Sequence, residues 1–78
     1  MTAIDLNAKA ESLGIAFEDY RAGSRMVSKA LWDYQGKETL EEYIAAVKSV
    51  PREQRVAFIR WNNLHKTYPD HFTWNEEE

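Results

Sequence analysis

The chain has 78 residues, no cysteine and a formal net charge of −3, and 44% of its residues are hydrophobic. A chain of this length forms one domain with a small core, and without cysteine it has neither disulfides nor thiolate zinc ligands. No stretch approaches the length of a membrane-spanning helix and the N-terminus lacks a basic segment followed by an apolar run, so the sequence predicts a cytoplasmic protein that is not embedded in a membrane.

The N-terminal residues predict a first helix over residues 3–13. Thr2 can cap its first turn, because a threonine oxygen accepts a hydrogen bond from an amide that has no helical partner. Gly14 follows the helix, and glycine is the usual residue at a left-handed helix stop. We therefore expect the first helix to end just before this glycine.

A second helical region is divided by Gly23. The short segment 15–22 precedes this glycine and either stands alone or extends the first helix through a bend. Ser24 follows it and is a suitable N-cap, so we expect a further helix over residues 24–34. Its apolar side chains repeat with the spacing of an amphipathic helix and are Val27, Ala30, Leu31 and Tyr34.

A capping box predicts the next helix. Thr39 lies three residues before Glu42, so each of the two side chains can accept a hydrogen bond from the other residue's amide. The apolar stripe that we expect to be buried is Leu40, Tyr43, Ile44 and Val47. Pro51 disfavours helix at the residue before it and suits a first helical turn. We therefore expect a break near residues 49–50 and a last helix after it.

The last predicted helix, residues 51–66, has two different faces at 100° per residue. One face is apolar and carries Ala57, Phe58, Trp61 and Leu64. The opposite face is polar and basic, includes one apolar residue, and carries Arg52, Arg55, Ile59, Asn62, Asn63 and Lys66. We expect the first face to join the core and the second to face the solvent.

An aromatic segment, residues 68–74, follows this helix. Its rings either fold back over the helices or stand ready for a partner. Residues 76–78 are glutamates that we expect to form a frayed acidic tail. No strand pattern competes with the helical signals. The sequence thus predicts an all-α fold: a single helical domain over residues 1–75, built as a compact bundle of three to five short helices with an aromatic C-terminal segment.

The chain lacks the residue patterns that catalysis and metal binding usually require. His65 and His71 have a proline between them, and their spacing does not place them on one helical face. Ser24 and Thr39 suit helix caps, and the remaining serines have no histidine nearby in the sequence, as a nucleophile and base would need. The glycines are too scattered to cradle a phosphate. We therefore expect no enzymatic activity, no metal and no cofactor.

Charge is segregated along the chain. Residues 48–66 carry five basic side chains and one acidic side chain, whereas residues 1–47 carry five basic and eight acidic ones. The basic face of residues 52–66 could therefore bind nucleic acid. An acidic chain gains little from the release of counterions, so the composition favours a protein partner over nucleic acid.

The stretch GIAFEDY, residues 14–20, with Ala8 and Ala10 upstream, resembles an early segment of the theta subunit of bacterial DNA polymerase III, a family of small helical proteins. Residues 27–31 and 38–43 align more loosely with the middle of that family. The similarity covers less than half of the chain. The resemblance implies a non-catalytic accessory subunit that binds the proofreading subunit of a DNA replicase.

Together these observations predict a small non-enzymatic protein–protein interaction module, which acts as a regulator, adaptor or inhibitor of a macromolecular machine. Small size and acidity are typical of phage- or plasmid-encoded inhibitors of host enzymes. Arginines and aromatic side chains dominate interface energetics, so we expect the last helix and the aromatic segment to form the contact surface. The expected partner-binding residues are Arg52, Arg55, Ile59, Asn62, Asn63, Lys66, Phe72 and Trp74. The sequence indicates neither the partner's identity nor the oligomeric state.

Overall fold

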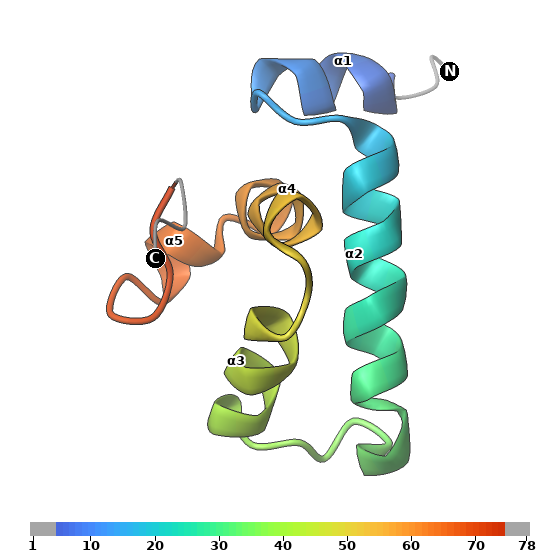
Figure 1. Cartoon of the computed structure of the whole chain (residues 1–78). Coiled ribbons are helices and arrows are strands. Elements are labelled where there is room, and N and C mark those ends of the chain that lie inside the picture. The colour runs from blue at the N-terminus through green and yellow to red at the C-terminus, as the bar shows by residue number, and fades with distance from the viewer. Residues whose placement is uncertain (1–4, 75–78) are drawn as a thin grey trace.

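A computed structural model describes residues 5–74, most of which are helical (Figure 1). In chain order the elements are α1 (Leu6–Ser12), α2 (Phe17–Ala30), the 3-10 helix η1 (Trp32–Tyr34), α3 (Leu40–Lys48), α4 (Arg52–Asn62) and α5 (Leu64–Thr67). The described residues contain no strand. The predicted all-α fold of three to five short helices is therefore confirmed.

The longest helix, α2, sets the layout of the domain (Figure 1). Helix α1 lies across its N-terminal end, and α3 follows near its other end after η1. Helices α2 and α4 make the most extensive helix–helix contact of the fold. Helix α5 and the C-terminal segment lie on the side of α4 away from α2 (Figure 1). Helix α4 consequently has neighbours on two sides.

Helix α1 is capped by Asp5, whose Oδ1 atom accepts a hydrogen bond from the Ala8 amide at 3.1 Å. This contact satisfies one of the amides that a helix start leaves without a partner. The predicted cap, Thr2, lies outside the described residues. After α1, Gly14 has a φ angle of +71°, a left-handed conformation that favours glycine. The predicted stop at this glycine is confirmed.

Helix α2 runs without interruption through Gly23 and Ser24, so the predicted break and the predicted new N-cap are both wrong. Gly23 lies where α2 crosses α4, and it allows the two helices to pack closely. Gly23 is buried, and a Cβ atom placed on it would lie 2.7 Å from the carbonyl oxygen of Gln54. Only glycine allows the two backbones to approach this closely.

Replacing Gly23 with alanine is expected to destabilise the domain. In the interior of a free helix the same change stabilises by about 1 kcal/mol. At this crossing we expect the free energy of unfolding to fall by about 1–3 kcal/mol, because the added methyl group meets a backbone oxygen that moves only with α4. Urea denaturation followed by circular dichroism measures the change.

The matched control is Ser28→Ala at an exposed position of the same helix, where we expect a change within about 0.5 kcal/mol. A Gly23→Ala protein as stable as the parent would mean that α2 and α4 do not cross at this distance.

Helix α3 begins with the predicted capping box, which is confirmed. Thr39 Oγ1 accepts a hydrogen bond from the Glu42 amide at 3.1 Å, and Glu42 Oε1 accepts one from the Thr39 amide at 2.9 Å. Of the predicted stripe, Ile44 and Val47 are buried and Tyr43 is half-buried against the core. Leu40 is 46% exposed, so its assignment to the core is wrong. It occupies the first position of α3, at the edge of the fold.

The predicted break before Pro51 is confirmed, because α3 ends at Lys48 and α4 begins at Arg52. The single helix predicted over residues 51–66 is interrupted at Asn63, which has a φ angle of +56°. Asparagine is one of the few residues that adopt this left-handed conformation at moderate cost. The interruption lets α5 turn away from α4.

One hydrophobic core joins α2, α3, α4, α5 and the C-terminal segment. Its buried members are Val27, Ile44, Ala46, Val47, Val50, Phe58, Ile59, Leu64 and Phe72. Phe72 is 1% exposed, so the aromatic segment folds back over the helices, which was one of the two arrangements left open by the sequence. Within residues 5–74, no helix is both long enough and apolar enough to cross a lipid bilayer.

A second group of aromatic rings packs the start of α2 against α4. Tyr20 stacks on Trp61 with ring centroids 4.4 Å apart, and Phe17 lies 5.5 Å from the same ring. Such ring pairs contribute about 0.5–1.5 kcal/mol beyond the area they bury. The Lys9 ammonium of α1 lies 4.2 Å from the centroid of Trp61, so this tryptophan also receives a cation–π contact.

Candidate functional site

Three of the predicted partner-binding residues are buried, so their assignment to the surface is wrong. Ile59 is 0% exposed, and it shares the core cluster with Val47 of α3 and with Phe72, itself a predicted contact residue. Arg55 is 8% exposed. The physical reason is the position of α4, which has neighbours on two sides. Ile59 and Arg55, which the helical period places opposite the apolar stripe, are therefore also covered.

Arg55 holds the turn between α3 and α4. Its Nη1 atom donates hydrogen bonds to the carbonyl oxygens of Lys48 and Val50, both at 3.3 Å. Carbonyl groups at a helix C-terminus have no helical partner and lie at the negative end of the helix dipole. The guanidinium therefore stabilises this turn from inside the fold, and it does not contribute to an exposed basic face.

The other five predicted residues lie at the surface on separate elements. Arg52 and Asn62 are at the two ends of α4, Asn63 lies between α4 and α5, Lys66 is in α5, and Trp74 is in the C-terminal segment. Their role in partner binding stays a prediction.

Arg60 joins segments that are far apart in the sequence. Its Nε atom donates a hydrogen bond to the carbonyl oxygen of Trp74 at 2.9 Å, and its Nη1 atom donates to those of Leu13 at 3.1 Å and Gly14 at 3.3 Å. The guanidinium also lies 4.4 Å from the centroid of the Trp74 ring. Sequence patterns report only neighbours within a few residues, so nothing in the sequence identifies these contacts.

Trp74 also meets His65 edge-on, with ring centroids 4.9 Å apart. Burial lowers the pKa of His65 below its usual value, and the charges of Lys66 and Arg60 lower it further. The imidazole is therefore neutral at neutral pH, and it supports the Trp74 ring. Across residues 5–74, no three histidine, aspartate or glutamate side chains gather into a group that could hold a metal ion.

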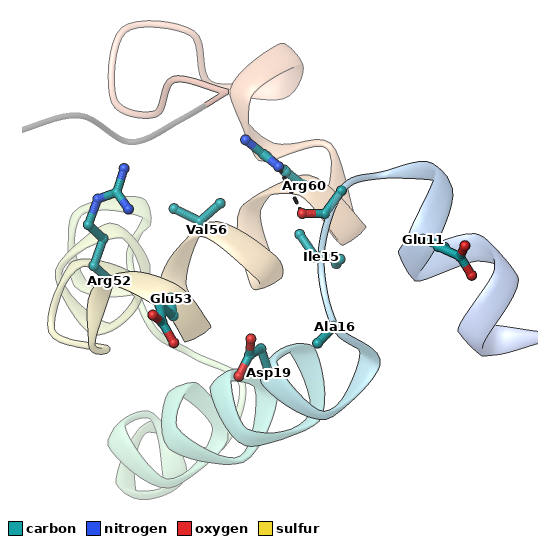
Figure 2. Close-up of a pocket in the computed structure, with 9 residues that line it drawn as sticks. Glu11, Ile15, Ala16, Asp19, Arg52, Glu53, Val56 and Arg60 are labelled. Carbon is teal, nitrogen blue, oxygen red and sulfur yellow. Dashed lines mark hydrogen bonds between the residues drawn. The ribbon is translucent and has the colours of Figure 1, made fainter.

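Figure 2 shows a groove between α4 and the link from α1 to α2, with a volume of about 560 Å³. Ile15 of the link and Val56 of α4 supply apolar surface inside it. The charged residues around it have both signs and are Glu11, Asp19, Arg52, Glu53 and Arg60. Such a mixture suits non-covalent contact with a polypeptide better than contact with a polyanion.

Two of the charged side chains in this groove already serve the fold. Asp19 Oδ1 accepts a hydrogen bond from Gln54 Nε2 at 3.3 Å, and Arg60 binds the carbonyl groups of the α1–α2 link. The residues that line the groove include no serine, threonine, tyrosine or histidine, so they do not form a nucleophile and base pair. We regard the groove as a secondary candidate for binding.

The most exposed large hydrophobic side chain of the described residues is Trp32, the first residue of η1. It is 77% exposed. It lines a second groove, with a volume of about 360 Å³, beside Leu31 of the α2 C-terminus, Gly36 and the buried ring of Phe58. We call Trp32 together with this groove the Trp32 surface. The lining of this groove is mixed, because Ser24, Ser28, Gln35 and Glu38 also belong to it. An exposed tryptophan is a side chain that interface centres favour.

The sequence already contained a signal for this surface. At 100° per residue, Trp32 falls outside the apolar stripe predicted for residues 24–34. Of that stripe, Val27 is buried and Leu31 is half-buried, but Ala30 and Tyr34 are exposed, so their assignment to the core is wrong. The α-helix ends at Ala30 and the 3-10 helix changes the direction of the side chains that follow.

One side-chain hydrogen bond connects η1 to the first turn of α3. A hydrogen bond between the Tyr34 hydroxyl and the Glu42 carboxylate, together with that negative charge, raises the pKa of Tyr34 above its usual value. The Thr39 amide, which donates to the same carboxylate, lowers the pKa of Glu42. Tyr34 is thereby engaged within the fold. The carbonyl oxygen of Trp32 accepts a hydrogen bond from the Gln35 amide at 3.3 Å, but within residues 5–74 its indole ring makes none.

Comparisons of the chain with known protein families, with characterised proteins and with solved structures give no match. The resemblance to the theta subunit accordingly stays a prediction.

Proposed function

We propose that this chain is a small non-enzymatic protein–protein interaction module, a regulator, adaptor or inhibitor, whose contact centre is the Trp32 surface. The supporting observation is the 77% exposure of Trp32. Tryptophan has the largest apolar area of any side chain, so its transfer from water into an interface contributes strongly to binding. Tryptophans at interface centres commonly contribute about 2 kcal/mol or more.

The Trp32 surface is favoured over the last helix and the aromatic segment. In that region Ile59 and Phe72 belong to the core, and Trp74 is engaged by Arg60 and His65. Burial of Trp74 in an interface would therefore disturb existing contacts. Burial of Trp32 would only add contacts, and the groove beside it can receive a side chain of the partner.

The test is a comparison of proteins captured from cells of the native host by the tagged chain and by its Trp32→Ala variant. We expect Trp32→Ala to change the free energy of unfolding by less than about 0.5 kcal/mol, because the ring is mostly in solvent. We expect recovery of the specific partner to fall about 30-fold, which corresponds to about 2 kcal/mol of binding free energy. Quantitative mass spectrometry measures the recovery, and urea denaturation measures the stability.

Two control variants sharpen this comparison. Leu6→Ala removes another exposed apolar side chain, in α1, the helix that lies across the N-terminal end of α2, and should leave capture unchanged. Trp74→Ala tests the surface suggested by the sequence. If no captured protein depends on Trp32, the proposal is rejected. A replicase proofreading subunit among the Trp32-dependent proteins would identify the module as an accessory subunit like theta.

A further inference from the structure

The outer face of α2 carries a row of three cations, Arg21, Arg25 and Lys29, which are all exposed. Within residues 5–74, none of the three side chains makes a hydrogen bond or an ion pair. Each follows the previous one by four residues, so the helix rise places neighbouring cations about 6 Å apart along the axis. The row is a patch of positive charge on an acidic chain.

The row leads into the Trp32 surface. Arg21, Arg25, Ser28 and Trp32 follow one another at intervals of four, three and four residues, and all four are exposed. Within α2 the first two intervals place Arg21, Arg25 and Ser28 on one side of the helix, over about 10 Å of its length. Trp32 belongs to the 3-10 helix that follows α2, and it lines the same groove as Ser28. We call Arg21, Arg25, Ser28 and Trp32 together the seam.

The two ends of this seam differ in chemistry. The first half carries the arginines. The second half carries Ser28 and Trp32, which both line the groove described above. Its apolar lining is Val27, Leu31, Trp32 and Phe58, and its polar lining is Ser24, Ser28, Gln35 and Glu38. A complementary surface needs carboxylates at one end and an apolar side chain at the other.

We propose that this seam receives an acidic helical segment of the protein partner. Carboxylates of the segment pair with Arg21 and Arg25, and an apolar side chain one to two turns further on enters the groove beside Trp32. The inference rests on the proposed function, because both use Trp32, and it adds the chemistry of the partner.

The surrounding charges favour an acidic helix over nucleic acid. Glu18 precedes the row of cations by one turn, Asp33 follows Trp32, and Glu38 lines the groove. A phosphate chain that continued past the row would meet these carboxylates at both ends. A short helix can carry carboxylates opposite the cations and none elsewhere, so it avoids this repulsion. Electrostatic complementarity excludes wrong partners in this way.

The test uses a synthetic helical peptide of about 18 residues, long enough to hold a helix, with glutamates at i and i+4 and leucines at i+8 and i+11. The peptide is titrated into the labelled full chain and followed by amide and indole NMR shifts. We expect shifts along the outer face of α2 and at the Trp32 indole, and an affinity that falls as salt is raised. A peptide with glutamine in place of both glutamates should bind at least about tenfold more weakly.

Matched variants locate the contact. Arg21→Gln with Arg25→Gln should weaken peptide binding at least about tenfold, whereas Arg52→Gln with Lys66→Gln, which removes the same charge from α4 and α5, should leave it unchanged. The proposal is overturned if the peptide gives no shifts at about 1 mM, if the glutamine peptide binds equally well, or if the second pair of substitutions has the larger effect.

A labelled oligothymidine is titrated alongside the peptide. If it binds the same face of α2 more tightly than the acidic peptide, the face recognises nucleic acid and the proposal is wrong. The capture experiment with Trp32→Ala does not involve the arginines or the peptide. A Trp32-dependent partner found without peptide binding would therefore overturn this inference and leave the proposed function intact.

Discussion

Replacing Ile59 with aspartate is expected to unfold the domain. The side chain is 0% exposed at the centre of the core, and an isolated carboxylate in such an environment costs several kcal/mol even after the structure relaxes. Small domains have a total stability near the lower end of about 5–15 kcal/mol. Loss of the helical circular dichroism signal and collapse of amide NMR dispersion at room temperature would show the effect.

The matched control for this substitution is Ile59→Val, which should remain folded and lose about 0.5–1.5 kcal/mol. If Ile59→Asp instead stays folded and fails only in partner binding, Ile59 lies on the contact surface, as the sequence alone suggested. The pair of variants therefore decides between the predicted basic face and the buried position in the structure.

Replacing Phe72 with alanine is expected to lower the free energy of unfolding by about 3–5 kcal/mol, the usual range for removing a buried phenylalanine. The ring is 1% exposed, is one of the largest fully buried side chains, and has the Lys48 ammonium 5.1 Å from its centroid. Urea denaturation of the full chain measures the loss.

His71→Ala is the matched control, because His71 is exposed beside the buried ring, and its effect should stay within about 0.5 kcal/mol. A loss below about 1 kcal/mol for Phe72→Ala would mean that the C-terminal segment does not belong to the core.

Local signals in the sequence were sufficient for several elements of the fold. The Thr39 and Glu42 pair, the stop at Gly14 and the break before Pro51 each depend on neighbours within one helical turn. They could be predicted because the physical cause lies inside the segment itself. Gly23 was wrongly predicted to break the helix. A glycine is needed there because the backbone of α4, more than thirty residues away, lies so close.

The candidate site shows the same difference between local signals, which the sequence contains, and long-range packing, which it does not. The helical period separated an apolar stripe from a polar face on α4, but it could not show that part of the polar face is also covered. Ile59 and Arg55 were therefore assigned to the solvent. The period also places Trp32 outside the apolar stripe predicted for residues 24–34, but only the fold shows that the residue is 77% exposed. Exposure depends on the packing of distant segments.

Arg60 couples the link between α1 and α2 to the C-terminal segment. One guanidinium binds the carbonyl groups that follow α1 and also the backbone and ring of Trp74. When either of these two segments opens, the other loses part of its attachment to Arg60. Their amide hydrogens should therefore exchange as one cooperative unit, because neither segment opens independently of the other.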